Sequence, residues 1–340
     1  MKTIRVSLIC YALVLLGSAA TALALTEENV SEKRNVSPGG KLVVDVDFGT
    51  IDVSSAEGNV VTVSAMRRIS AGDEAKEKEF LAAAPITVTQ EGNTVTVRAR
   101  RSKSGEGWSW RGSSRLEGKY TITVPEKFNV QLDTSGGGIT VNRINGEVRA
   151  DTSGGTLTFS HLRGPLIGNT SGGSIKIDDC VGVLKIETSG GKIDIQGGSG
   201  NVDAQTSGGS IVVRNFGGDA KVETSGGSLR FENVRGELRG ETSGGSIAAT
   251  VPSPVPGDVR LETSAGRIEV HLPPDAALNV DAESSMGRVT SDFPVTVQGK
   301  QDRDRLRGTI NGGGKLLVLR TSAGGIALRQ GTPTPEPSKP

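Results

Sequence analysis

The tetrapeptide Thr-Ser-Gly-Gly recurs at a fixed interval through the middle of the chain, and this repeat limits the possible folds more than any other feature. Each copy begins 18 residues after the one before it (152 − 134 = 18). A constant period of this length is typical of solenoids, in which each repeat forms one unit that stacks on the next. The copies begin at Thr134, Thr152, Thr170, Thr188, Thr206, Thr224 and Thr242.

Apolar and polar residues alternate at two places in every repeat. In the first repeat, one alternation contains Ile139 and Val141 and the other contains Val148 and Ala150, with Ile144 as a fifth apolar position between them. Alternation with a period of two predicts a strand with one buried face. We therefore predict an all-β protein that forms a single parallel β-solenoid (β-helix), with two short strands and two corners in each coil.

One coil could not hold this shape alone. Its five inward side chains contribute at most roughly 1.5–3 kcal/mol each, whereas ordering the backbone costs on the order of 1–2 kcal/mol per residue. Stacking offsets that cost, because the coils above and below satisfy the backbone N–H and C=O groups of each strand. The repeat therefore implies a long stack of coils in register.

The paired glycines are expected to form one corner of each coil. A corner needs a positive φ or a close approach of two backbones, and other residues resist both. We therefore expect Gly208→Val and Gly209→Val to destabilise the protein more than Ser210→Val. The corner glycines are Gly136, Gly137, Gly154, Gly155, Gly172, Gly173, Gly190, Gly191, Gly208, Gly209, Gly226, Gly227, Gly244 and Gly245.

The first 24 residues have the pattern of a secretory signal peptide. Lys2 and Arg5 precede the apolar run Val6–Ala20, and Ala22-Leu23-Ala24 fits a cleavage site. An uncleaved membrane anchor is the alternative, although the run is short for a membrane span. We expect export to the periplasm, the cell envelope or the medium, with no transmembrane segment in the mature chain.

The rest of the chain divides by the regularity of its pattern. We expect irregular β coils over residues 25–125, regular 18-residue coils over 126–251, irregular C-terminal coils over 252–330, and a disordered Pro-rich tail over 331–340. A short helix is predicted at 73–84, where Asp73 can cap the first turn and Pro85 follows the last. We expect this helix to cover the open end of the solenoid, because exposed strand edges invite aggregation.

Few residues stand out as candidates for a functional site. Trp108 and Trp110, in a polar Gly-rich segment, could stack on a sugar ring, or they could pack against the flank of the solenoid. His161 and Asp179 fall in one column and could touch, whereas His271 has no evident partner. Four oppositely charged pairs are expected along one outer face, as a self-neutralising surface or as a docking surface. They are Arg149/Asp151, Lys185/Glu187, Lys221/Glu223 and Arg239/Glu241.

The sequence contains no catalytic motif, and we expect neither a metal nor a cofactor. The formal net charge of +1 argues against a nucleic-acid partner, which normally needs a basic face. Cys180, which shares a column with Leu162, is expected to be a buried apolar residue and not a reactive thiol. The alternative reading is a polysaccharide-active β-helix enzyme, which would need carboxylates clustered in a cleft.

Several short stretches resemble the bacterial putative adhesin family, a group of β-strand-repeat proteins of unknown function. The resemblance covers roughly Val30–Leu328 and rests on the Thr-Ser-Gly-Gly-x-Ile corners and on four further stretches. It implies a secreted or envelope protein that serves as a non-catalytic, adhesin-like binding or scaffold module, with a surface protein or a glycan as partner. The further stretches are Gly49–Val53, Tyr120–Pro125, Leu272–Pro274 and Thr321–Ile326.

Overall fold

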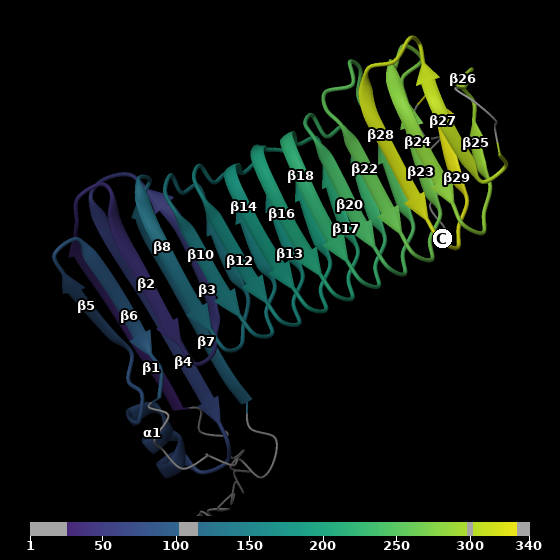
Figure 1. The fold of residues 1–340 in the computed structure, drawn as a ribbon. Coiled ribbons are helices and arrows are strands. Elements are labelled where there is room, and N and C mark those ends of the chain that lie inside the picture. Colours follow the sequence, from purple (N-terminus) through teal and green to yellow (C-terminus); the bar gives the residue numbers. More distant parts are fainter. Residues whose placement is uncertain (1–25, 102–114, 298–301, 332–340) are drawn as a thin grey trace, which may run out of the picture.

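The chain forms two long sheets that face each other across one continuous hydrophobic core (Figure 1). The computed structural model describes residues 26–101, 115–297 and 302–331. These residues contain one helix, α1 (Glu74–Ala82), and the rest of the regular structure is β-strand. The predicted fold class, an all-β parallel solenoid with one short helix, is confirmed.

One sheet has 14 strands and contains the first strand of each regular coil. Neighbouring strands in the regular part are parallel and shifted by one repeat, so that Ile139 pairs with Leu157 and Leu157 with Ile175. In spatial order the strands are β1 (Thr26–Asn35), β4 (Val60–Ser70), β7 (Arg115–Pro125), β3 (Thr50–Ala56), β9 (Ile139–Asn142), β11 (Leu157–Ser160), β13 (Ile175–Asp178), β15 (Ile193–Gln196), β17 (Ile211–Arg214), β19 (Leu229–Glu232), β21 (Ile247–Thr250), β23 (Ile268–Leu272), β29 (Ile326–Gln330) and β25 (Val289–Ser291).

The opposite sheet has 15 strands and contains the second strand of each regular coil. In spatial order, from the same end, they are β5 (Thr87–Glu91), β6 (Thr94–Ala99), β2 (Gly40–Val46), β8 (Phe128–Thr134), β10 (Val148–Thr152), β12 (Leu166–Thr170), β14 (Val181–Thr188), β16 (Ser199–Thr206), β18 (Gly217–Thr224), β20 (Leu238–Thr242), β22 (Val259–Thr263), β28 (Lys315–Thr321), β24 (Leu278–Ser284), β27 (Arg305–Ile310) and β26 (Thr296–Val297).

The inward positions predicted from the alternation are the buried ones. Ile139, Val141, Val148 and Ala150 are completely buried, and so are the equivalent isoleucines Ile175, Ile193 and Ile211 of later coils. Because each of these residues is in register with its equivalents one coil away, the core is a set of parallel columns of side chains. Cys180 occupies one of these columns, and burial raises the pKa of its thiol to about 11.

The order of coils in space departs from the order in sequence at both ends. The coil of β2 and β3 lies between the coil of β6 and β7 and the coil of β8 and β9. At the other end, the coil of β28 and β29 lies between β22–β23 and β24–β25. The 18-residue pattern fails in these segments, so it could not show the interleaving.

The N-terminal end is closed by strands and not by the helix. β1 and β4 form antiparallel pairs with β4 and β7, and β5 is antiparallel to β6. α1 lies beyond the strand ends in Figure 1 and packs Phe80 and Leu81 on Ile69. Asp73 caps the helix as predicted, accepting a hydrogen bond from Lys76 N. The expected position of α1 over the open end is therefore corrected.

Candidate functional site

The threonine of each repeat is buried and builds a hydrogen-bonded line along one corner of the solenoid. Thr206 Oγ1 donates to Gly191 O of the preceding coil at 3.0 Å and accepts from Gly209 N at 3.3 Å. The same two bonds recur at Thr224 and Thr242. Each coil is therefore joined to the one before it by a side chain as well as by the strand ladders, which makes this corner a rigid edge.

A shallow polar groove of about 400 Å³ runs beside this line at the N-terminal side of the regular coils. We call it the corner groove. Its outward side chains come from the residue before each threonine and from the serine after it, so that every coil contributes the same two kinds of group. They are Asp133 and Ser135, Asp151 and Ser153, Asn169 and Ser171, and Glu187 and Ser189.

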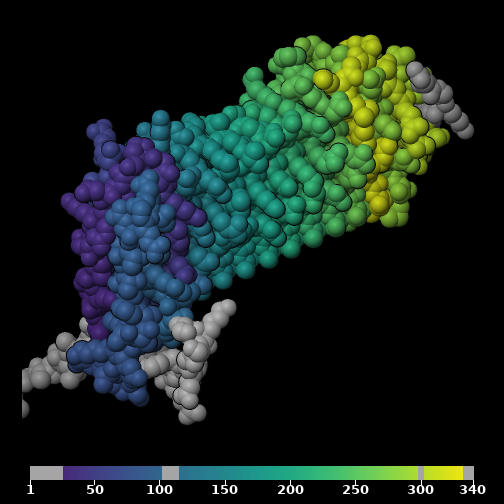
Figure 2. Space-filling view, turned by 60° about the vertical axis from the view of Figure 1, so that its left-hand side comes forward, coloured from purple at the N-terminus to yellow at the C-terminus, as the bar shows by residue number. Residues whose placement is uncertain are grey.

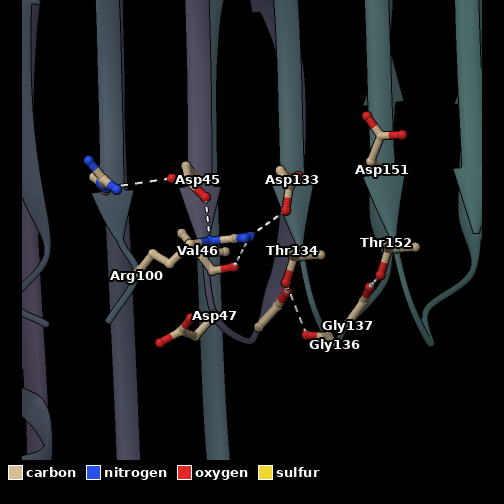
Figure 3. Close-up of polar contacts among 12 residues, drawn as sticks. Asp45, Val46, Asp47, Arg100, Asp133, Thr134, Gly136, Gly137, Asp151 and Thr152 are labelled. Atoms are coloured by element: carbon tan, nitrogen blue, oxygen red, sulfur yellow. Dashed lines mark hydrogen bonds and ion pairs between the residues drawn. The ribbon is translucent and has the colours of Figure 1, made fainter. Parts of the chain in front are cut away.

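Arg100 also lines the corner groove, and Figure 3 shows its polar contacts. Its guanidinium group forms ion pairs with Asp45 and Asp133, and it donates to Val46 O at 3.1 Å. Arg100 follows β6, which pairs with β2, and β2 in turn pairs with β8, so this cation lies near strands that are distant in sequence. Arg100 is therefore shared between Asp133, the first carboxylate of the row, and Asp45, which lies outside the groove.

The next carboxylate of the row also has partners. Asp151 accepts from Arg149 Nε at 2.9 Å and from Asn169 Nδ2 at 2.7 Å. Consecutive coils are about 4.8 Å apart, so the acidic groups stand in a line and do not converge on one point. Within the described parts of the chain, no group of three or more His, Cys, Asp or Glu residues could hold a metal ion. The groove thus offers a row of hydrogen-bond acceptors and hydroxyl groups.

The two glycines of each corner have different roles. A Cβ atom at Gly209 would lie 1.9 Å from Gly191 O, whereas a Cβ at Gly208 would have no neighbour closer than 3.7 Å. Of the paired glycines, only Gly137 has a positive φ, at 125°. The prediction that both glycines are required is therefore corrected: the second is fixed by the close approach of the preceding coil, and the first has room for a side chain.

The other candidate residues have ordinary surroundings or lie outside the description. Trp108 and Trp110 fall outside the described residues, as do residues 1–24 and nearly all of the tail. Asp179 forms an ion pair with Arg163 at 2.8 Å, and no contact with His161 is seen among the described side chains. His271 does have a partner, since its Nε2 lies 2.9 Å from Glu269 Oε1.

Two of the four expected charge pairs form on the outer face. Arg149 contacts Asp151 at 2.9 Å, and Lys221 contacts Glu223 at 2.9 Å. Arg239 lies 4.0 Å from Glu237 instead of pairing with Glu241. For the described Lys185 and Glu187, no ion pair is seen. These pairs are about half exposed, so each contributes little to stability.

Two features were missed from the sequence. The first is the buried threonine line, since a polar residue beside two glycines indicates a turn more readily than a core position. The second is a column of non-glycine residues with positive φ at the second corner. Asparagine at two of these positions was an available signal, because it tolerates this conformation. The column contains Arg143, His161, Asp179, Asn215 and Asn233.

The described residues contain no helix that is long and apolar enough to span a membrane. A second hollow, of about 460 Å³, lies near the N-terminal end and is lined by polar and apolar residues, among them Pro38, Asn59, Lys127 and Arg143. It is shallow and lacks the repeated lining of the corner groove.

Comparison with known proteins gives one extended match. The sequence model of the Toastrack DUF4097 family matches residues 40–329. No curated protein matches the sequence.

Several solved structures also align over most of the chain. A protein described as a "putative adhesin" from Parabacteroides merdae is 10% identical, with a TM-score of 0.36 and coverage of 90% of this chain and 97% of that one. A "putative adhesin" from Bacteroides fragilis is 13% identical, with a TM-score of 0.33 and coverage of 89% and 97%. A "putative cell adhesion protein" from Clostridium sporogenes is 13% identical, with a TM-score of 0.24 and coverage of 89% and 100%. Resemblances this distant assign no function to the chain.

Proposed function

The chain belongs to the Toastrack DUF4097 family, and from that premise and the geometry above we propose that it is a non-catalytic binding or scaffold module of the bacterial envelope. The observation that carries this proposal is the repetition of an outward serine and an outward carboxylate or amide side chain, in register, on coil after coil. A solenoid held in this way is rigid and presents its surface groups at regular intervals. Such a surface suits a partner that is itself extended and repetitive.

The corner groove is the surface that we assign to this partner. Serine hydroxyls donate and accept hydrogen bonds, and carboxylates accept them. Together they complement a polymer that presents hydroxyl, amide or amine groups at regular intervals, as a glycan does. The threonine line fixes the backbone beneath these groups, so little conformational freedom would be lost on binding.

The alternative function is cleavage of a polysaccharide. The corner groove contains three carboxylates, those of Asp133, Asp151 and Glu187. Acid–base catalysis would need two of them free to act at one bond, but Arg100 holds the first, and Arg149 and Asn169 hold the second. Two of the three carboxylates are thus held by partners, and the row does not converge on one point, which supports binding more than catalysis.

A glycan panel tests both functions. We expect the purified chain to bind a subset of glycans without releasing products. The variant Asp151→Ala/Asn169→Ala/Glu187→Ala should lose this binding, and Thr158→Ala/Lys176→Ala/Asp194→Ala, on the opposite sheet of the same region, should keep it. Product release by the wild-type chain would favour the enzyme, and equal binding by both variants would remove the groove from the proposal.

Export is also part of the proposal. The positive, apolar and small-residue pattern of residues 1–24 supports cleavage after Ala24. Expression of residues 1–340 in a bacterial host should give a periplasmic or secreted product whose N-terminus, read by mass spectrometry, is Leu25. An intact N-terminus in the membrane fraction would support an uncleaved anchor instead.

A further inference from the structure

The last coil of the chain occupies an internal position in the stack. β28 pairs with β22 on one side and β24 on the other, and β29 pairs with β23 and β25. The threonine line passes through it: Thr321 Oγ1 donates to Gly266 O at 2.9 Å, and Ser284 Oγ donates to Gly324 O at 2.7 Å. We call β28 and β29 the inserted coil.

The two coils on either side of the inserted coil would also match each other directly. Thr321 pairs with both Thr263 and Ser284, which are 21 residues apart (284 − 263). Ile326 likewise pairs with both Ile268 and Val289, again 21 residues apart (289 − 268). Thr242 and Thr263 have the same separation (263 − 242) and do stack directly. The sequence therefore carries a second register, in which β24–β25 stacks on β22–β23 in chain order.

The connection between these coils is long enough for either arrangement. The connection from Thr250 in β21 to Val259 in β22 is nine residues long (259 − 250) and leads to the adjacent level of the stack. The connection from His271 in β23 to Val280 in β24 is also nine residues long (280 − 271), but it leads two levels along the stack. A cavity of about 320 Å³ lies at this crossing, lined by Pro254, Pro273, Ala276 and Lys315 among others. The connection that spans two levels thus leaves space beside the start of the inserted coil.

Within the described residues, the inserted coil is attached to the stack at one end only. Asn311–Gly314 joins it to β27, and within residues 302–331 no strand follows β29. It could therefore leave the stack without another segment being unthreaded. Its inward residues Leu317, Leu319, Ile326 and Leu328 are at most 1% exposed, so the inserted state is strongly favoured and departures are rare.

We propose that β28–β29 is a removable insert, and that β24–β25 closes onto β22–β23 in chain order when it leaves. Closure would re-form both ladders and the threonine line, with Ser284 taking the place of Thr321 opposite Gly266. The fold then has two states at this end, a longer stack that contains the insert and a shorter stack with a free C-terminal segment.

Two double-cysteine variants of the full chain separate these states. Glu262, Arg320 and Glu283 are outward and consecutive in register, so Glu262 is about 4.8 Å from Arg320 and about 9.6 Å from Glu283 in the inserted state. A disulfide needs Cα atoms within about 7 Å. Glu262→Cys/Arg320→Cys should therefore cross-link at once in a glutathione buffer, and Glu262→Cys/Glu283→Cys should cross-link only when the insert has left.

We expect the 262–283 disulfide, identified by peptide mass spectrometry, to form at least about tenfold more slowly than the 262–320 disulfide, but at urea concentrations below global unfolding. Hydrogen exchange of wild-type protein should show residues 315–330 opening before residues 238–272. The proposal is overturned if residues 315–330 open only with the whole stack. It is also overturned if they open early while the 262–283 disulfide fails to form, because the coils would then not close.

Discussion

The middle and the ends of this solenoid are built from similar coils, but they differ in whether the order of the coils in space follows their order in sequence. From β8 to β21, each coil stacks directly on the next coil in sequence, and one 18-residue pattern sets strands, core and corners. At each end, a coil that is early or late in the sequence (β2–β3 or β28–β29) lies inside the stack, with other strands beyond it (Figure 1). Local pattern therefore determines the form of a coil, whereas its position in the stack depends on contacts between distant segments.

The two ends also differ in how their edges are covered. The N-terminal edge of one sheet is the ten-residue strand β1, half of whose residues are charged, and such charges protect an edge from further pairing. The C-terminal edges are β26 and β25, of two and three residues. Figure 2 shows the N-terminal part coming forward at the left and the regular coils extending from it to the C-terminal coils. One end is protected by charge and the other by short strands.

The largest effect should come from a corner in the middle of the stack. Gly209→Ala should cost about 3–5 kcal/mol or prevent folding, because its Cβ would meet Gly191 O at 1.9 Å. Gly208→Ala is the matched control and should cost below about 1 kcal/mol. Urea unfolding measures both, and equal midpoints for the two variants would contradict the assigned corner geometry.

A smaller loss is expected from the threonine line. Thr206→Val leaves Gly191 O and Gly209 N without their hydroxyl partner in a buried place, which should cost about 1–3 kcal/mol. Thr206→Ser keeps the hydroxyl and should cost less, as Ser284 already fills an equivalent position. If the serine variant were the less stable of the two, the hydroxyl would not be the stabilising group.

The corner and the threonine line also show which parts of the structure could be predicted from the sequence and which could not. The alternation at Ile139/Val141 and Val148/Ala150 gave the strands, the core and the register, because burial of one face leaves a period-two pattern. The difference between Gly208 and Gly209 was hidden, since it depends on the preceding coil. The corner groove was hidden for a related reason: Arg100 contacts Asp45 and Asp133 from strands whose order in space could not be read from the irregular N-terminal segment.

The N-terminal end should respond to acid before the middle does. Glu77 is a buried residue of α1, and the N–H of Ala71, followed by the hydroxyl of Thr26, holds the pKa of this carboxyl below its usual 4.5. A depressed pKa stabilises the fold above the unfolded value and ceases to do so as pH falls through the folded value. Hydrogen exchange below pH 4.5 should therefore rise first around α1, and Glu77→Gln should remove that pH dependence. Uniform exchange along the chain would count against this local anchor.

The smallest effect is expected on the outer face. Lys221 and Glu223 form an ion pair whose side chains are about 46% and 38% exposed. Lys221→Ala should therefore change the free energy of unfolding by less than about 0.5 kcal/mol. A loss above about 1 kcal/mol in thermal or urea unfolding would show that the charged face stabilises the stack more than its exposure allows.

Distances between pairs of spin labels test most directly the claim that coils stack one level at a time and interleave at the ends. A label at Asp151 would be paired in turn with a label at Glu262, Arg320 or Glu283, which follow it by six, seven and eight levels in register. At about 4.8 Å per level, the predicted distances are about 29, 34 and 38 Å in that order. A distance to position 283 shorter than the distance to position 320 would mean that the coils follow the sequence to the end, contrary to the order described above.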